Sequence, residues 1–340
     1  MKPSQVQSAL LHCLAVQRPV FLWGAVGVGK SDLVAKVAAQ TGRELRDVRL
    51  SLLDPVDLKG FPVPDTENRQ MTWLPADFLP PTMVKKGTKM APNPSKGILF
   101  LDEMNSALPA VQGAAYQLIL NRRIGDYVLP AGWDIIAAGN RSGDRSVTHS
   151  MPAALSNRLL HIDYEVNLDE WCGWAIDNDI SPSLVAFLRF RSNLLHNFDP
   201  KINPRSFPTP RSWFFANQVL GSKLEPNVEF ELLKGTVGEG AAGECMAFMR
   251  IVRDLPNIDQ ILIDPDSVAV PTELSAKYAV ATTLAARASR DNIDRLMKYI
   301  NRVPTEFQVV FTRDAARRDP TVAKTKSFTD WLIKNSDVLS

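Results

Sequence analysis

Short apolar runs alternate with helical patterns through residues 1–165 of the chain. Residues 98–101 and 135–138 are continuous apolar runs, as expected for strands buried on both faces of a sheet. Residues 20–23 and 161–164 predict two more strands, and the alternation of Val48, Leu50 and Leu52 with polar residues predicts a fifth. Helical patterns separate them, at residues 31–40 and at the one-faced apolar positions 111, 114, 115 and 118. Five strands with intervening helices predict a mostly parallel α/β sheet.

Residues 166–340 carry a different pattern and predict an all-α region with Pro-punctuated connections. Between strands of the first region, residues 54–96 hold eight prolines, which exclude a long regular helix there. A long ordered loop in a compact domain is usually functional. Lys85, Lys86, Lys89 and Lys96 make part of this loop basic. We interpret them as a solvated loop, with contact to an anionic partner or nucleic acid as the alternative.

The segment 24–31 reads Gly-Ala-Val-Gly-Val-Gly-Lys-Ser and fits G-x-x-x-x-G-K-[ST] between a predicted strand and a predicted helix. Glycines let backbone N–H groups approach phosphate oxygens, and the helix N-terminus adds its dipole. Lys30 would place its ammonium on the β- and γ-phosphates of a nucleotide, and the Ser31 hydroxyl would ligate Mg²⁺. The alternative is a glycine-rich turn that happens to precede a helix.

The predicted strand 98–101 ends in two acids, Asp102 and Glu103. A carboxylate at a strand end can hold a metal directly or through water, and Asp102 fits that role. Hydrolysis also needs a group that orients and polarises the attacking water, and Glu103 fits that one. An acidic helix N-cap is the alternative interpretation of the pair.

Composition narrows the class of protein. The 39 basic and 37 acidic residues give a net charge of +2, which argues against a highly basic nucleic-acid coat protein. No run of about 18 apolar residues is present, so no membrane-spanning segment is expected. The polar residues 1–7 do not resemble a secretory signal. The three cysteines, Cys13, Cys172 and Cys245, lie far apart and predict a reducing compartment, with neither a disulfide framework nor a zinc site. We therefore expect a cytoplasmic protein.

The spacing of the glycine-rich loop and the Asp-Glu strand resembles the AAA+ ATPases, and more closely their MoxR-like branch. Matching motifs are frequent over residues 17–165, and beyond them the resemblance is limited to residues 209–213. It is carried by five segments: residues 24–31, residues 54–60 (DPVDLKG), residues 97–103 (GILFLDE), residues 137–141 (AAGNR) and residues 151–158 (MPAALSNR). The residues that such proteins use for nucleotide and metal are matched here by Gly24, Ala25, Val26, Gly27, Val28, Gly29, Lys30, Ser31, Asp32 and Asp102.

Three further polar residues match positions that report on the γ-phosphate. Asn140 ends the apolar strand 135–138 and matches sensor 1, with a turn Asn as the alternative. Arg158 matches the arginine finger that acts on a neighbouring subunit, and Arg141 and Arg145 are rival candidates. Arg211 follows Pro210 at a predicted helix start and matches sensor 2 of the lid, with a solvent-exposed Arg as the alternative.

Two other motifs carry less weight. Residues 238–243 match G-x-G-x-x-G, but no apolar strand precedes them, so we predict close helix packing and no second dinucleotide site. Residues 123–130 resemble the short insert that faces the ring axis or a partner in MoxR-like proteins, and a plain β-turn explains them equally well.

The resemblance implies an α/β P-loop NTPase domain at residues 1–165, a helical lid at 166–255 and a helical C-terminal extension at 256–340. It implies a ring, expected to be a hexamer, that uses ATP and Mg²⁺ to remodel or activate a protein client, with a von Willebrand factor A-domain protein as the expected partner. The alternative is a nucleic-acid-linked motor or a component of a DNA restriction or defence system. A nucleotide-binding scaffold that does not turn over is a third hypothesis.

Overall fold

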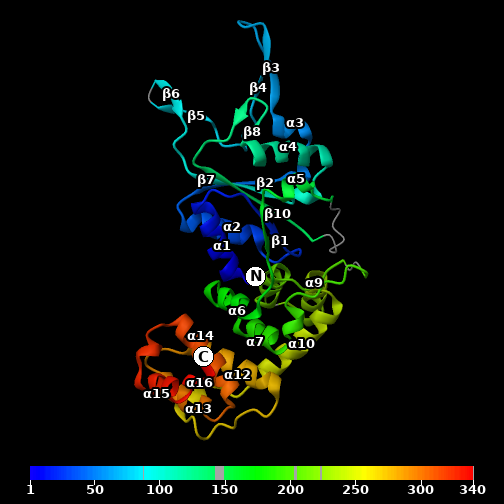
Figure 1. Ribbon diagram of the computed structural model, residues 1–340. Helices are drawn as coiled ribbons and strands as arrows, with labels where there is room; N and C mark the ends of the chain where they lie inside the picture. Colours follow the sequence, from blue (N-terminus) through cyan, green and yellow to red (C-terminus); the bar gives the residue numbers. More distant parts are fainter. Residues whose placement is uncertain (87, 142–148, 203–204, 223, 340) are drawn as a thin grey trace. The chain divides into compact units, whose positions relative to one another are not determined.

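The computed structural model describes residues 1–86, 88–141, 149–202, 205–222 and 224–339 (Figure 1). The chain divides into two compact units, Met1–Val166 and Asn167–Ser340. The first is α/β and the second is helical, as the hydrophobic patterns predict. In the part of the chain that is described, no helix combines the length and apolar character needed to cross a membrane.

A five-stranded sheet forms the centre of the first unit, in the order β11-β1-β10-β7-β2. All four pairings are parallel, so the predicted parallel sheet is confirmed. Every residue of the two strands β7 and β10 is buried, because helices cover both faces of the sheet. The strands are β1 (Val20–Trp23), β2 (Glu44–Arg49), β7 (Gly97–Asp102), β10 (Trp133–Gly139) and β11 (Leu160–Asp163).

Side chains alternate between two apolar layers along each strand. Leu22 and Phe100 pack with the layer that holds α1 (Pro3–Ala15) and α2 (Lys30–Gln40). Phe21 and Leu101 pack on the opposite side, in the layer that holds α4 (Pro109–Asn121). This two-sided burial fixes the register of the strands, since a shift by one residue would exchange the two layers.

The predicted strand through Val48, Leu50 and Leu52 is wrong in its second half. Strand β2 ends at Arg49, and Leu50–Leu52 form a 3₁₀ turn (η1) in which Leu50 is buried and Leu52 is 76% exposed. Arg49 pairs with Asp102, the last residue of β7, so no partner strand continues beyond it. The apolar alternation continues through Leu50 and Leu52, but β7 offers no further backbone hydrogen bonds to extend the strand.

The Pro-rich segment forms one short helix and two hairpins. Helix α3 (Pro55–Lys59) is followed by the hairpin β3 (Phe61–Asp65) and β4 (Gln70–Leu74), and then by β5 (Met83–Lys86) and β6 (Lys89–Pro92). The exclusion of a long helix is confirmed. Both hairpins extend from the part of the unit that carries α3 and α4 (Figure 1). Pro62 and Pro64 of β3 lie opposite Trp73 and Met71 of β4.

A third hairpin follows α4, with strands β8 (Arg123–Ile124) and β9 (Tyr127–Val128). The buried hydroxyl of Tyr127 donates to the carbonyl of Pro80 at 2.8 Å. The Thr82 hydroxyl donates to the carbonyl of Val128 at 3.2 Å. These bonds tie the predicted short insert to the segment that leads into β5.

The described residues of the second unit form helices and connecting loops. Helix α12 packs on both α7 and α14, so helices from the predicted lid and the predicted extension share one compact unit. The boundary predicted between residues 255 and 256 stays a prediction. The helices are α6 (Leu168–Asp177), α7 (Pro182–Phe190), α8 (Pro210–Leu220), α9 (Pro226–Val237), α10 (Glu239–Arg253), α11 (Ile258–Ile263), α12 (Leu274–Arg287), α13 (Ile293–Ile300), α14 (Thr305–Arg318), α15 (Lys326–Lys334) and α16 (Ser336–Leu339).

Ion pairs join helix α14 to α6 and α7. Arg189 of α7 and Asp314 of α14 are almost completely buried, and Nη2 of Arg189 donates to Oδ1 of Asp314 at 2.7 Å. Nearer the surface, Arg313 pairs with Asp169 at 2.9 Å. The buried pair matters most for stability, because a charge left without its partner in the interior is costly.

The glycines of the G-x-G-x-x-G match have different surroundings. Gly238 separates α9 from α10 with φ of +86°, and a Cβ there would lie 3.0 Å from the Ser206 carbonyl oxygen. A Cβ at Gly240 or Gly243 would meet no described atom within 4 Å. The predicted close packing is therefore wrong for those two, and the match reflects a turn between helices. A helix, α9, precedes the motif, which agrees with the absence of a dinucleotide-binding strand.

Candidate nucleotide-binding site

The glycine-rich loop connects the end of β1 to the first residue of α2. Gly27 and Gly29 have φ of 75° and 93°, in the left-handed region that L side chains rarely adopt. The loop therefore needs glycine at these two positions. It delivers Lys30 and Ser31 as the first residues of a helix, where unpaired N–H groups and the helix dipole favour an anion.

Lys30 is only 9% exposed, and its ammonium donates to oxygens of the glycine-rich loop and of Asn140. Nζ donates to the carbonyls of Gly24 at 2.7 Å and Ala25 at 3.1 Å. It also donates to Oδ1 of Asn140, at the end of β10, at 3.0 Å. The bond to Asn140 joins residues 110 positions apart at one edge of the sheet.

Ser31 and Asp102 lie together at the same edge, where the Ser31 hydroxyl donates to Oδ2 of Asp102 at 2.9 Å. Asp102 is the last residue of β7 and is 7% exposed. A hydroxyl beside a carboxylate is a set of oxygen donors that suits Mg²⁺, which binds through one or two protein oxygens and several waters or phosphate oxygens. The two residues therefore fit the predicted metal.

Glu103 follows Asp102 in the left-handed conformation, with φ of 53°, and its N–H donates to Oδ1 of Asp102 at 2.8 Å. A non-glycine residue in this region costs of order 1–3 kcal/mol, and such strain clusters at functional sites. The conformation turns the chain sharply after the strand. The Glu103 side chain accepts a hydrogen bond from the hydroxyl of Ser51, in the turn after β2.

Asp47 of β2 adds a third carboxylate to this neighbourhood. Its pKa is raised by loss of hydration and by the negative charges of Asp102 and Glu103, while Arg49 lowers it. The end of the sheet thus concentrates negative charge, which a bound divalent cation would relieve.

Asn105, two residues after Glu103, holds the end of β10. Its amide makes two hydrogen bonds to the backbone of Asn140, with Nδ2 donating to the carbonyl at 2.7 Å and Oδ1 accepting from the N–H at 3.2 Å. Asn105 is 4% exposed. Asn140 is thus fixed through its backbone by one neighbour, while its side chain contacts Lys30.

The remaining predicted residues lie in different places. Asp32 is exposed in the first turn of α2. Arg158 is exposed between α5 (Ala153–Ser156) and β11, and Arg141 pairs with Asp163 at 3.6 Å. Arg145 lies outside the described residues. Arg211 belongs to the second unit, where it is the exposed second residue of α8, a helix that begins after its N-cap Thr209 as predicted.

Sequence patterns alone did not identify Ser51, Asp47 or Asn105. Ser51 and Asp47 come to the site through the pairing of β2 with β7, and β2 is the strand whose predicted extent is wrong. Asn105 follows the Asp-Glu pair so closely that its position was a usable signal. Its partner Asn140 lies 35 residues away, so the contact itself could not be read from the pattern.

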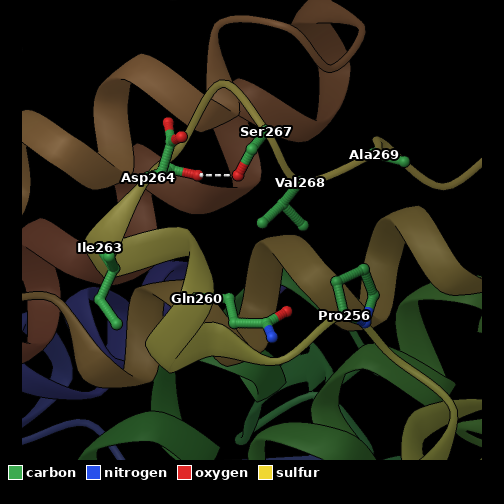
Figure 2. A pocket seen from close by; sticks show the side chains of 7 residues that line it. All are labelled: Pro256, Gln260, Ile263, Asp264, Ser267, Val268 and Ala269. Carbon is green, nitrogen blue, oxygen red and sulfur yellow. Dashed lines mark hydrogen bonds between the residues drawn. The ribbon is translucent and has the colours of Figure 1, made fainter.

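A cavity of about 530 Å³ in the second unit is unrelated to these residues. Figure 2 shows its lining, in which the Ser267 hydroxyl donates to the Asp264 carbonyl at 3.1 Å. None of the predicted site residues lines it. The lining residues are Pro256, Gln260, Ile263, Asp264, Ser267, Val268 and Ala269.

Comparison with known proteins gives one family match, to the AAA domain (dynein-related subfamily), over residues 19–159. Midasin from Giardia intestinalis is 29% identical over 186 residues, which covers 52% of this chain and 4% of that protein. The chain therefore corresponds to a small part of the length of that relative.

Two solved structures show a more distant likeness. NtrX from Brucella abortus in complex with ADP has a TM-score of 0.43 and 12% identity, over 99% of this chain and 68% of that one. The RuvB Holliday junction branch migration motor from Thermotoga maritima has a TM-score of 0.38 and 16% identity, over 88% and 86%. Both scores are below 0.5 and do not establish a common arrangement over the whole chain. Residues 19–159 thus match an AAA-domain model, and the five-stranded parallel sheet has the P-loop NTPase fold of the AAA+ ATPases.

Proposed function

We propose that this chain hydrolyses ATP in a Mg²⁺-dependent reaction. One observation carries the proposal: Lys30 contacts Asn140, and Ser31 contacts Asp102, at the same edge of the sheet where Glu103 follows the end of β7. These are the charges and donors that phosphoryl transfer needs, namely a cation for the phosphates, oxygens for a metal and a carboxylate for water.

Each residue has a distinct task in this proposal. Lys30 exchanges its backbone acceptors for oxygens of the β- and γ-phosphates, which is favourable because these oxygens carry full charge. Glu103 accepts a hydrogen bond, and then the proton, from the water that attacks the γ-phosphorus. Asn140 donates its amide to the γ-phosphate or to that water. Mg²⁺, held by Ser31 and Asp102, would neutralise charge on the phosphates.

We propose further that several copies assemble into a ring, expected to be a hexamer. Arg158 is exposed, so it is available to a neighbouring subunit, whereas Arg141 already pairs with Asp163. An arginine supplied in this way stabilises charge on the transferring phosphoryl group and is worth about 10³–10⁵-fold in rate. Arg211 is proposed to contact the nucleotide of its own subunit as the second unit moves.

The resemblance to MoxR-like proteins leads us to propose remodelling of a protein client as the output, with a von Willebrand factor A-domain protein as partner. A nucleic-acid-linked motor is the second candidate. It is favoured by one feature, the β5–β6 hairpin, where Lys85, Lys86 and Lys89 are exposed and the described residues of both strands carry no acid.

Glu103→Gln tests the catalytic assignment. The variant keeps the shape of the side chain but cannot accept a proton, so we expect it to bind ATP and to lose hydrolysis by at least about 10²-fold. Glu67→Gln, in the turn between β3 and β4, is the matched control and should hydrolyse ATP like the parent. Parental rates in both variants would contradict the assignment of Glu103.

The Glu103→Gln variant held in ATP should also retain its assembled state and capture its client. Recovery of an A-domain protein would support the client assignment. Stimulation of the parental ATPase by DNA or RNA, with a steep loss of stimulation as salt rises, would replace it with the nucleic-acid motor.

A further inference from the structure

We propose that Asn105 is a positioning residue that aligns Asn140 for the γ-phosphate and ties it to the turn that carries Glu103. This inference rests on the proposed function, because it assigns Asn105 a part in the same ATP hydrolysis. Asn105 touches neither the glycine-rich loop nor the metal oxygens by any described contact, so it acts through Asn140.

The contact between the two asparagines is specific in geometry. A primary amide that donates to a backbone carbonyl at 2.7 Å and accepts from the N–H of the same residue at 3.2 Å pairs with the peptide as a neighbouring strand would. The Asn105 side chain therefore takes the place of a ladder partner just where β10 ends at Gly139. The backbone of Asn140 cannot rotate without breaking both bonds.

Gly139 gives the amide the room for this contact. A Cβ at position 139 would lie 2.2 Å from Oδ1 of Asn105 and 2.7 Å from the Phe21 ring. Any side chain here would push the Asn105 amide away from the strand. The contact at the end of β10 therefore needs both residues, the amide of Asn105 and the missing side chain of Gly139.

The backbone of Asn105 is itself held in place by hydrogen bonds to its carbonyl. Its carbonyl accepts from the N–H of His149 at 2.7 Å and, more weakly, from Nε2 of Gln112 at 3.4 Å. Gln112 is buried in α4 and donates a better bond to the carbonyl of Ala107 at 2.9 Å. Asn105 therefore belongs to a short segment, from Glu103 to Ala107, that is fixed to the sheet and to α4.

The consequence is a mechanical link between the water-activating turn and the γ-phosphate contact. Asn140 faces Lys30 through its side chain and Asn105 through its backbone. When the γ-phosphate leaves, a change at Asn140 is passed directly to the residue two positions after Glu103. Misplacement of a positioned group by about 1 Å can cost about 10²-fold in rate, so this link is expected to affect turnover more than binding.

A double-mutant cycle tests the link, using Asn105→Ala, Asn140→Ala and the double variant. We expect Asn105→Ala to lower kcat by about 10- to 100-fold and to leave the KM for Mg-ATP within about threefold of the parent. The double variant should be no slower than Asn140→Ala alone within about twofold, because Asn105 acts only by placing the Asn140 side chain, which Asn140→Ala has already removed. The matched control is Asn121→Ala, an exposed residue of the same type at the end of α4.

Hydrogen exchange supplies a readout that does not depend on activity. The Asn140 amide should exchange at least about tenfold faster in Asn105→Ala, while the Ile136 amide in the middle of β10 keeps its parental rate. Asn105→Asp guards against a folding defect, since it keeps the acceptor for the Asn140 N–H and loses the donor. It should keep the Asn140 amide protected and lose less kcat than the alanine variant.

The outcomes separate the two proposals. If the parent hydrolyses ATP and Glu103→Gln abolishes this, but the losses from Asn105→Ala and Asn140→Ala multiply, the role of Asn105 is overturned and the ATPase stands. Unchanged exchange of the Asn140 amide in Asn105→Ala overturns it as well. If the parent shows no Mg²⁺-dependent hydrolysis, both proposals fall together.

Discussion

The hydroxyl of Ser51 donates a hydrogen bond to Oε2 of Glu103. The bond fixes the direction in which the Glu103 carboxylate points, and a general base must lie within hydrogen-bond reach of the water that it activates. We expect Ser51→Ala to lower kcat for ATP hydrolysis by about tenfold, measured as steady-state phosphate release.

Ser8→Ala is the control for this change, because Ser8 lies on α1 and its hydroxyl bonds only the backbone of Ser4 among the described contacts. An unchanged or higher kcat for Ser51→Ala would contradict the prediction. It would show that contacts other than the Ser51 hydroxyl orient Glu103.

Removal of the Ser31 hydroxyl should weaken the binding of Mg²⁺ at the proposed metal site. The hydroxyl bonds Asp102 at 2.9 Å and is the second oxygen of the proposed Mg²⁺ set. We expect Ser31→Ala to raise the Mg²⁺ concentration for half-maximal ATPase by about 10- to 100-fold, whereas Ser31→Thr keeps a hydroxyl and stays close to the parent. A magnesium titration at saturating ATP measures this, and an unchanged midpoint in Ser31→Ala would remove Ser31 from the metal site.

The raised pKa of Asp47 predicts a pH dependence of stability. The folded chain binds the Asp47 proton more tightly than the unfolded chain, whose reference pKa is 3.8. The contribution of this group is therefore most favourable below the unfolded pKa and is lost as the pH rises through the folded pKa. At neutral pH the charged Asp47 opposes folding through its loss of hydration and through its repulsion with Asp102 and Glu103.

Asp47→Asn should accordingly raise the melting temperature at pH 7 without nucleotide, and the gain should shrink as the pH is lowered through the raised pKa of Asp47. Asp126→Asn, an exposed acid in the β8–β9 turn, is the control. Melting curves from pH 8 down to the unfolded reference pKa of 3.8 measure both. A lower melting temperature for Asp47→Asn at pH 7 would contradict the sign worked out here.

Asp314→Ala should destabilise the chain strongly. The change leaves the Arg189 guanidinium buried without its partner, which costs about 3–5 kcal/mol. The double change Arg189→Met with Asp314→Leu should recover most of that loss, because two apolar side chains of similar volume need no partner. Urea unfolding monitored by tryptophan fluorescence measures both.

Asp259→Ala provides the contrast, since the Arg287–Asp259 pair is exposed and is worth about 0–1 kcal/mol. Equal losses for Asp259→Ala and Asp314→Ala would mean that burial does not set the value of these pairs.

The central strands and the glycine-rich loop could be predicted because their signals are local. Ile98 to Leu101 is apolar at every position, and the G-x-x-x-x-G-K-S spacing sets its own loop conformation. The end of β2 could not be predicted from its own residues, because β2 ends where its partner strand β7 ends. The two hairpins between residues 61 and 92 were also beyond the pattern, since prolines exclude a helix without specifying which strands pair.

The site divides in the same way. Sequence motifs alone predict four residues of the site, and the sheet brings them together: Lys30, Ser31, Asp102 and Glu103. Ser51 and Asn105 act through contacts across 52 and 35 residues, so only strand pairing and a backbone–amide contact reveal them. The glycines at 240 and 243 show the opposite case, in which a motif is present without the packing that usually explains it.

The two prolines of β3 have a consequence for how the hairpin meets other molecules. Because proline has no N–H, the β3–β4 ladder runs through Phe61, Val63 and Asp65, and Pro62 and Pro64 turn toward the outer edge. A foreign strand laid along that edge would find carbonyls but no donors at these positions. The β3 edge of the hairpin therefore disfavours pairing with a strand of another chain. Such pairing would have to use the β4 edge, through the backbone of Met71 and Trp73.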